Sequence, residues 1–270
     1  MQYRTLNIVL LITMIAGLLF IPVALSSCSS PAAEVDSMPE LAQIPLIDSN
    51  IPSTLETATF ALGWFWGSDA KFGSLDGVIR TRVGYAGGTT ENPTYYRLEY
   101  HAETVQIDYD PAVISYQQLL NVIWENYDTT MPAYSTQYRS VIFYHNEEQK
   151  RLAEEWKQQW ETKTGNKIYT EIIPYKAFYL AEDYHQKYYL KIQSSLYDEL
   201  KRIYPDSKQL TNSTAAARIN GYMAGYGTFA QLQQQIDLYG LSGAGKEKLL
   251  EIGKRRIIDT GVGAVCPVPE

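Results

Sequence analysis

The sequence predicts an α+β fold in which an antiparallel sheet carries helices on one face. Between residues 58 and 144, apolar and amphipathic segments follow one another as strand, helix, strand, strand, helix, strand. The chain has 270 residues, of which 45% are hydrophobic and 20% charged, enough for one sizeable core and a smaller unit. The βαββαβ order is that of the ferredoxin-like two-layer α/β sandwich, which we expect here together with a small helical C-terminal extension.

The first half of this core consists of short apolar runs separated by turns. Strands are predicted over Ala58 to Leu62 and over Val78 to Tyr85, with a helix over Trp66 to Ser74 between them. Gly63 supplies the turn that leads into the helix, and the small residues after Trp66 suit a first helical turn. The free N–H groups of such a turn favour negative charge, so a side chain displayed there is a candidate for chemistry.

The second half repeats this pattern after the loop "AGGTTENPTYYRLE". Strands are predicted over Glu103 to Tyr109 and over Tyr138 to Tyr144, and a helix over Tyr116 to Tyr127. The apolar residues of the helix fall on one face at helical spacing, and Ser115 is a candidate N-cap. These segments complete the predicted sandwich.

Further elements are expected beyond residue 144, and a boundary near Pro205 to Ser213 divides them. Before the boundary the sequence predicts a charged helix over Glu147 to Thr162, a strand near Tyr169 to Ile173 and a helix from Glu182 to about Ile203. After it, three short helices separated by glycines are predicted over Ala215 to Met223, Phe229 to Leu238 and Lys246 to Ile252. Residues 205–270 would therefore form the helical extension and a tail rich in glycine and proline.

The N-terminus has the pattern of an export signal. Arg4 precedes an apolar segment from Leu6 to Leu25, and "LSSC" resembles the lipobox of bacterial-type lipoproteins, in which the cysteine, here Cys28, is lipidated. Residues 1–27 would then be a signal peptide and residues 28–56 a flexible linker, with order beginning near Thr57. The alternative is an uncleaved membrane anchor, since about 20 apolar residues can span a bilayer. Either way the chain is expected outside the cytoplasm, tethered to a membrane in the periplasm or at the cell surface.

Charge and cysteine content exclude several functional classes. The net charge is -7 and the basic residues form no stripe, so we expect no nucleic-acid partner. The two cysteines are Cys28 and Cys266; with the first lipidated, Cys266 is the one free thiol and no disulfide can form within a chain. The three histidines lack ligand spacing, so no metal site is expected. We expect a monomer.

Several motifs follow one another in an order that resembles one family. "GWFWG", "VGYAGGTTENPTYY", "HAETVQIDYDPAVISYQQLL", "TQYRS", "FYHNEEQK" and "AEDYHQKYYLK" lie between about Thr57 and Lys191. This stretch resembles the peptide methionine sulfoxide reductase A family, which has the ferredoxin-like fold. The resemblance makes residues 57–204 a reductase A-like domain and implies reduction of peptide-methionine (S)-S-oxide. It implies no bound cofactor, with thioredoxin or another thiol as reductant of an active member.

The resemblance also implies roles for five residues. In this family a glutamic acid delivers a proton to the sulfoxide oxygen, helped by two tyrosine hydroxyls, while a Phe-Trp pair holds the methyl group. The matching proton donor is Glu103, and the matching hydroxyls belong to Tyr95 and Tyr138. The methyl pocket would be formed by Phe65 and Trp66. Methionine sulfoxide in proteins or peptides is the implied substrate.

The sequence departs from the family pattern at the nucleophile. The family's cysteine position is occupied by Trp64, and an indole can form neither a thiolate nor a sulfenic acid. Nearby, Ala133 replaces an aspartate, Tyr127 a histidine and Tyr100 a glycine of the family pattern. The tail "GVGAVCP" is similar in composition to tails that carry a resolving cysteine in some members. Without a sulfenic acid that thiol has nothing to resolve.

Three functions remain open from the sequence. The first is a membrane-tethered methionine sulfoxide reductase, which the five matching residues favour and Trp64 opposes. The second is a non-catalytic binding module, in which Trp64 joins the aromatic residues in a pocket for a methyl sulfoxide or another methylated group. The third is a structural role, with Trp64 filling the vacated site as part of the core.

Overall fold

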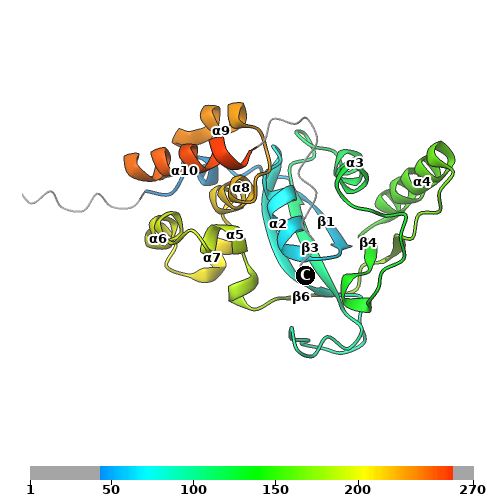
Figure 1. The fold of residues 1–270 in the computed structure, drawn as a ribbon. Coiled ribbons are helices and arrows are strands. Elements are labelled where there is room, and N and C mark those ends of the chain that lie inside the picture. Colours follow the sequence, from blue (N-terminus) through cyan, green and yellow to red (C-terminus); the bar gives the residue numbers. More distant parts are fainter. Residues whose placement is uncertain (1–42, 258–270) are drawn as a thin grey trace, which may run out of the picture. The chain divides into compact units, whose positions relative to one another are not determined.

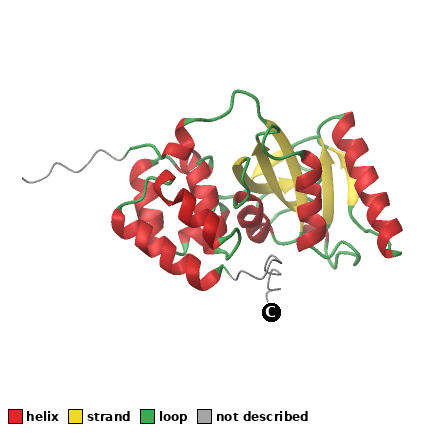
Figure 2. Ribbon diagram, turned by 90° about the horizontal axis from the view of Figure 1, so that it is seen from above, coloured by secondary structure: helices red, strands yellow, loops and turns green. Residues whose placement is uncertain are grey.

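A six-stranded mixed sheet runs through the centre of the protein, with helices packed around it (Figures 1 and 2). The structure is a computed structural model that describes residues 43–257. The strands are β1 (Glu56–Leu62), β2 (Val78–Ala86), β3 (Ala102–Tyr109), β4 (Ser140–Tyr144), β5 (Glu171–Pro174) and β6 (Phe178–Leu180). Their order across the sheet is β5-β4-β1-β3-β2-β6.

Strands β1 to β4 are those that the sequence predicted, and every neighbouring pair among them is antiparallel. Strand β5 adds to β4 in parallel, and β6 adds to β2 antiparallel. The register places Glu103 opposite Tyr85 and Thr59 opposite Phe143. Since β3 lies between β1 and β2, the carboxylate of Glu103 comes from the middle of the sheet.

The helices lie at the two sides of the sheet and across it. They are α1 (Leu46–Ser49), α2 (Phe65–Gly73), α3 (Tyr116–Asn126), α4 (Glu147–Thr164), α5 (Tyr188–Lys191), α6 (Ser194–Ile203), α7 (Ser207–Thr211), α8 (Thr214–Met223), α9 (Phe229–Gln235) and α10 (Gly243–Arg256). In Figure 1, α6 to α10 gather on one side of the sheet and α3 and α4 on the other. Within residues 43–257, no helix combines the length and apolar character that crossing a membrane requires.

The main core fills the space between one face of the sheet and helices α2, α3 and α4. Its buried members include Phe60 and Ile107 from the sheet, Phe72 from α2 and Leu120 from α3. The predicted N-cap of α3 is confirmed, because the Ser115 side chain accepts from the backbone of the third helical residue in a capping box. The helical spacing in the sequence therefore corresponds to the buried face of this helix.

Helix α8 packs directly against α2, and small residues make this close approach possible. A Cβ atom on Gly73 would lie 2.7 Å from the carbonyl oxygen of Ala217, and one on Gly221 would lie 2.7 Å from Cβ of Ser74. The buried guanidinium of Arg218 donates to the carbonyl oxygens of Gly73 and Val78. The C-terminal helices thus support the helix that carries the Trp64 to Trp66 segment.

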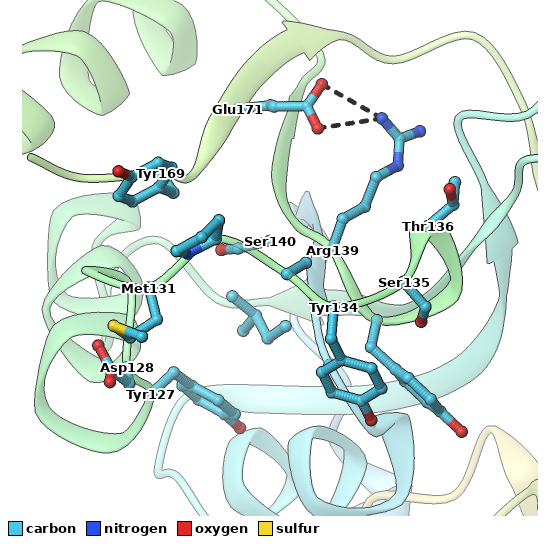
Figure 3. Close-up of a pocket in the computed structure, with 15 residues that line it drawn as sticks. Tyr127, Asp128, Met131, Tyr134, Ser135, Thr136, Arg139, Ser140, Tyr169 and Glu171 are labelled. Carbon is cyan, nitrogen blue, oxygen red and sulfur yellow. Dashed lines mark hydrogen bonds and ion pairs between the residues drawn. The ribbon is translucent and has the colours of Figure 1, made fainter.

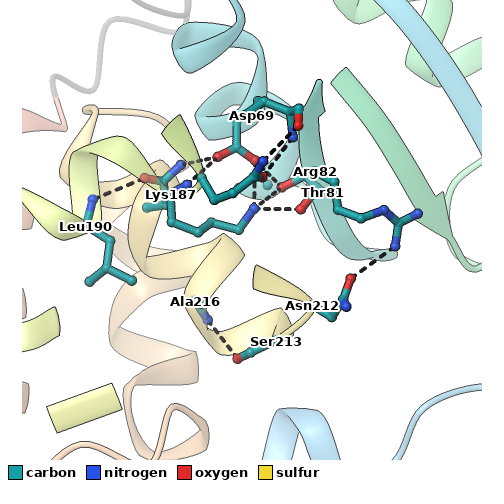
Figure 4. Close-up of polar contacts among 12 residues, drawn as sticks. Asp69, Thr81, Arg82, Lys187, Leu190, Asn212, Ser213 and Ala216 are labelled. Atoms are coloured by element: carbon teal, nitrogen blue, oxygen red, sulfur yellow. Dashed lines mark hydrogen bonds and ion pairs between the residues drawn. The ribbon is translucent and has the colours of Figure 1, made fainter. Parts of the chain in front are cut away.

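A fully buried ion pair joins α2, the sheet and the segment before α5 (Figure 4). Lys187 Nζ lies 2.8 Å from Asp69 Oδ1 and donates to the carbonyl oxygen and the hydroxyl of Thr81. Asn220 of α8 donates to the other Asp69 oxygen at 3.1 Å and accepts from the N–H of Leu190. Burial lowers the pKa of Lys187, and the Asp69 carboxylate counteracts this effect.

The single helix predicted from Glu182 to about Ile203 is wrong. The structure has a 3-10 turn over Asp183–His185, then α5 and α6. Lys187 adopts φ 52° and ψ 47°, a left-handed conformation, and its N–H bonds to Asp69 rather than to a helical carbonyl. The tertiary contact with Asp69 therefore interrupts a segment whose side chains suit a helix.

Order begins earlier than the predicted start near Thr57, because α1 is held in place by a distant segment. Asp48 accepts hydrogen bonds from the hydroxyls of Tyr204 and Ser213 and from the backbone N–H of Thr214. The carboxylate lies at the N-terminus of α8, where the helix dipole favours it. Such a contact has no local signature in the sequence.

Three further differences concern segment boundaries. Tyr138 lies in a 3-10 turn, Thr136–Tyr138, so β4 begins only at Ser140. Strand β6 was not predicted, because only three residues bond to the edge of β2. The predicted boundary segment contains the short helix α7, which Asp206 caps by accepting from the N–H of Lys208.

We predict that Asp69→Ala lowers the free energy of unfolding by about 3 to 5 kcal/mol, because it leaves the buried Lys187 ammonium without its counter-charge. Asp237→Ala is the matched control: it removes an exposed partner of Lys246 at 2.7 Å and should cost less than about 1 kcal/mol. Urea denaturation followed by circular dichroism measures both values. Equal losses in the two variants would contradict the role of the buried pair.

Candidate functional site

The turn between β1 and α2 presents a helix N-terminus to the centre of the sheet. Gly63 has φ 78°, a left-handed value that glycine adopts without strain. Trp64 is the N-cap of α2, with φ −65° and ψ 113°, and its side chain makes no capping hydrogen bond. The first helical N–H, that of Phe65, has no acceptor within the helix and donates to Glu103 Oε2 at 3.0 Å.

Glu103 is fully buried under this turn. Its second oxygen accepts from Nε2 of Gln137 at 2.8 Å. Burial raises the pKa of Glu103 to about 7, although the hydrogen bonds from Phe65 and Gln137 oppose this effect. The carboxyl group therefore holds a proton through the acidic range and can release it near neutral pH, as a general acid must.

The Tyr138 side chain lies near Glu103, and the Tyr95 side chain lies beside Tyr138. Tyr138 and Tyr95 share a side-chain hydrogen bond, and burial, then the Glu103 carboxylate, raise the pKa of Tyr138. The raised pKa keeps the Tyr138 hydroxyl protonated and able to donate at neutral pH. The backbone N–H of Tyr95 donates to Glu182 Oε1 at 3.1 Å, and Tyr85 donates to Glu182 Oε2 at 2.7 Å.

Aromatic rings form the wall of the site next to α2. Phe65 is 1% exposed, and its ring centre lies 5.0 Å from that of His185. Trp66 stacks on Tyr188, with ring centres 3.7 Å apart and planes 2° from parallel. The Trp66 indole N–H donates to Nδ1 of His185 at 3.1 Å, and burial lowers the pKa of His185. The imidazole is therefore neutral, with its proton on Nε2.

Trp64 lies half-buried at the edge of this wall. Its ring centre is 4.7 Å from that of Trp66, and it packs against the buried cluster that contains Phe65 and Tyr85. An indole at a helix N-cap offers one N–H donor and an aromatic face. The N-cap position of α2 is thus occupied by a packing side chain.

A cavity of about 510 Å³ opens beside the turn (Figure 3). Figure 3 shows Tyr127, Asp128 and Met131 grouped on one side of it, and Arg139 paired with Glu171 on another. Gly63 and Tyr138 also belong to its lining. The remaining lining residues are Leu62, Pro132, Ala133, Tyr134, Ser135, Thr136, Ser140 and Tyr169.

The structure brings together the six residues that the sequence singled out for this site: Trp64, Phe65, Trp66, Tyr95, Glu103 and Tyr138. Cys28, the predicted lipidation site, and Cys266, the predicted free thiol, lie outside the described residues. Three other residues were singled out in the sequence near the site. Tyr127 and Ala133 line the neighbouring cavity, and Tyr100 is 68% exposed with φ 71°.

Sequence reasoning assigned no role to four residues that shape the site. Gln137 belongs to the motif "TQYRS", in which it directly precedes Tyr138, and its side chain donates to Glu103. Glu182, His185 and Lys187 all belong to "AEDYHQKYYLK". This motif contributed to the family resemblance, yet only the fold reveals that it borders the site.

Among the described residues, no group of three or more histidine, cysteine or acidic side chains is placed to hold a metal ion. The three histidines lie apart and bond to different partners. His101 Nδ1 accepts from the N–H of Gly88 at 3.1 Å, and His145 bonds to Thr59 at 2.9 Å. His185 bonds to Trp66 as described above.

Comparison with known proteins gives one family. Residues 56–218 match the family model "Peptide methionine sulfoxide reductase". A peptide methionine sulfoxide reductase of Drosophila melanogaster is 42% identical over 206 residues, covering 75% of this chain and 81% of the relative. The MsrA protein of Methanosarcina acetivorans is 50% identical over 149 residues, covering 51% of this chain and 79% of the relative. Reduced Mxr1 of Saccharomyces cerevisiae covers 52% of this chain and 87% of its own at 33% identity, with a TM-score of 0.49.

We predict that Glu103→Gln stabilises the protein above pH 7. The native state raises the pKa of this carboxyl group from 4.5 to about 7, so its stabilising proton is fully present below pH 4.5 and is lost as the pH rises through about 7. The wild type should therefore lose up to about 3 kcal/mol between these limits relative to the variant. Urea denaturation at pH 5 and pH 8 measures this. A stability difference that does not change with pH would contradict the raised pKa.

Proposed function

Because the chain belongs to the peptide methionine sulfoxide reductase family, we propose that its site recognises the (S)-S-oxide of methionine in proteins but lacks the usual thiol step. One observation carries this proposal. A buried carboxyl group with a pKa of about 7 lies under a helix N-terminus whose N-cap is Trp64, the position at which the resemblance implies a nucleophile. The recognition groups are thus present without a thiol at the position from which the family's attack begins.

Each group in the site has a chemical task in this proposal. The protonated carboxyl of Glu103 donates to the sulfoxide oxygen, and the hydroxyls of Tyr138 and Tyr95 donate to the same oxygen. Phe65 and Trp66 pack around the methyl group, which is apolar and fits between aromatic faces. Gln137 and the N–H of Phe65 hold the carboxyl group in its orientation.

The reductive step requires two electrons. In the family reaction a thiol sulfur takes the oxygen, so that thiol and sulfoxide become sulfenic acid and thioether. Trp64 has no atom that can accept oxygen in this way. The wild-type chain would therefore bind methionine sulfoxide without reducing it, and thioredoxin or another thiol reductant would matter only for a form that turns over.

A binding module for related methylated groups is the second candidate, and one observation favours it. Trp64, Trp66 and Tyr188 place three aromatic rings next to one another, with the acid Glu103 nearby. Aromatic faces attract thioethers, methyl groups and methylated cations alike. A structural filling role for Trp64 would instead leave no ligand space at all.

The setting of this function is also part of the proposal. The lipobox-like segment at Cys28 would tether the protein to a membrane on the extracytoplasmic side, where oxidised surface proteins are the partners. No nucleic acid takes part, and the protein acts as a monomer. The order β4-β1-β3-β2 with the connecting α2 and α3 supports the ferredoxin-like sandwich as the fold of residues 57–204.

We predict that the wild type shows no turnover of a methionine sulfoxide peptide with dithiothreitol, and that Trp64→Cys introduces it. The new thiolate would lie at the N-terminus of α2, where the helix dipole lowers its pKa. Trp64→Ser is the matched control, because it opens the same space without a thiol and should stay inactive. Wild-type turnover that Cys266→Ala abolishes would contradict the proposal and assign the chemistry to the tail.

A second experiment tests recognition alone. Calorimetry with N-acetyl-methionine sulfoxide methylamide should show binding that weakens about 10-fold as the pH rises from 5.5 to 8.5, because the Glu103 carboxyl loses the proton that it donates. Glu103→Gln keeps an N–H donor that does not titrate, so its affinity should stay constant over this range. Absence of binding at pH 5.5 would favour the filling role of Trp64.

A further inference from the structure

We propose that the cavity beside Gly63, described above, receives an apolar, preferably aromatic, side chain adjacent to methionine sulfoxide in the substrate chain. This inference rests on the proposed function and adds a specificity site to it. The substrate class is an extended peptide segment that carries Phe, Tyr, Leu or a similar residue next to the oxidised methionine.

The cavity borders the recognition site through two residues. Gly63 and Tyr138 line it, and each has an immediate role in the site: Gly63 precedes Trp64, and Tyr138 bonds to Tyr95. The two residues are neighbours in space, since a Cβ atom on Gly63 would lie 4.0 Å from the Tyr138 carbonyl oxygen. A peptide whose sulfoxide reaches Glu103 would therefore lead its next residue towards the cavity.

Apolar and aromatic side chains dominate the lining. Leu62, Tyr127 and Ala133 contribute to the walls. Met131 is 65% exposed and Tyr134 is 81% exposed, so two large side chains on one loop stand uncovered at the rim. The Tyr134 ring centre lies 5.5 Å from that of Tyr138, which connects the rim to the site.

The volume and charge of the cavity match one class of side chain. About 510 Å³ lies within the range of small-molecule sites and exceeds what a single aromatic ring occupies. The charged lining residues are Asp128, Glu171 and Arg139, two acids against one base. Arg139 places its guanidinium 3.2 Å from both oxygens of Glu171 and bonds to the Gly87 carbonyl oxygen at 2.9 Å. An acidic side chain would therefore meet negative charge.

Two uncharged lining residues contribute to the apolar character of the cavity. Ala133 has a small side chain and leaves room in it. Tyr127 contributes a large aromatic surface. An apolar side chain of the substrate would therefore be buried against them.

Peptide calorimetry on the full chain tests the inference at pH 5.5. Two series of acetylated pentapeptides place Phe, Gly or Asp directly before or directly after methionine sulfoxide, and N-acetyl-methionine sulfoxide methylamide reports the sulfoxide site alone. Only one of the two series places the variable residue in the cavity. In that series, the Phe peptide should bind about 10-fold more tightly than the Gly peptide. Asp in that position should bind about 3-fold more weakly than Gly.

Variants of the lining separate the cavity from other contacts. Tyr134→Ala should reduce the Phe to Gly affinity ratio to about 2-fold, and Ala133→Asp should do the same by adding charge and bulk. Tyr96→Ala is the matched control: Tyr96 is 91% exposed and its ring centre lies 5.5 Å from that of Tyr95, but it does not line the cavity. This variant should leave the ratio unchanged.

The outcomes distinguish the two proposals. Binding of the methylamide with equal affinity for Phe and Gly peptides would overturn the subsite and leave the proposed function standing. A preference for Phe that Tyr134→Ala does not reduce, or that Tyr96→Ala abolishes, would also overturn it. Failure of every sulfoxide ligand to bind would overturn the proposed function, and the subsite with it.

Discussion

The buried ion pair between Lys187 and Asp69 determines where α2 lies. A charge without water around it is stable only beside its counter-charge and with its remaining hydrogen bonds made, so Lys187, Asp69 and Thr81 permit one arrangement of helix and sheet. Asn220 extends the same network to α8. The turn at Gly63 and Trp64 lies at the N-terminus of α2, about one helical turn before Asp69, so its position over β3 follows from this network.

The position of α2 in turn sets the electrostatics of the site. The first N–H of the helix meets Glu103 because β3 runs through the middle of the sheet, next to β1. Burial there raises the pKa of the carboxyl group to about 7, and the hydrogen bonds with Phe65 and Gln137 hold it in place. Burying this carboxyl group costs stability near neutral pH, where it loses its proton. Such perturbed pKa values are common at functional sites.

Trp64 lies half-buried at the N-cap of α2, within the arrangement of the site. Around it are the hydrogen bond of Phe65 to Glu103, the stacking of Trp66 on Tyr188 and the contact between Tyr95 and Tyr138. At the rim of the site, Tyr127, Ala133 and Tyr134 line a largely apolar cavity. In the proposed function, recognition and reduction depend on different atoms, so the chain would bind the sulfoxide without reducing it.

By itself the sequence determined the four central strands, α2, α3 and α4, and the six residues that meet in the site. Alternation, helical spacing and turn residues are local signals, and the ordered motifs identified the family. Only the tertiary structure decided that the segment after Glu182 breaks at Lys187, that α1 folds onto α8 through Asp48, and that Gln137 and His185 border the site. These features depend on contacts between distant residues, and a buried charge or a borrowed helix cap outweighs what the neighbouring residues favour.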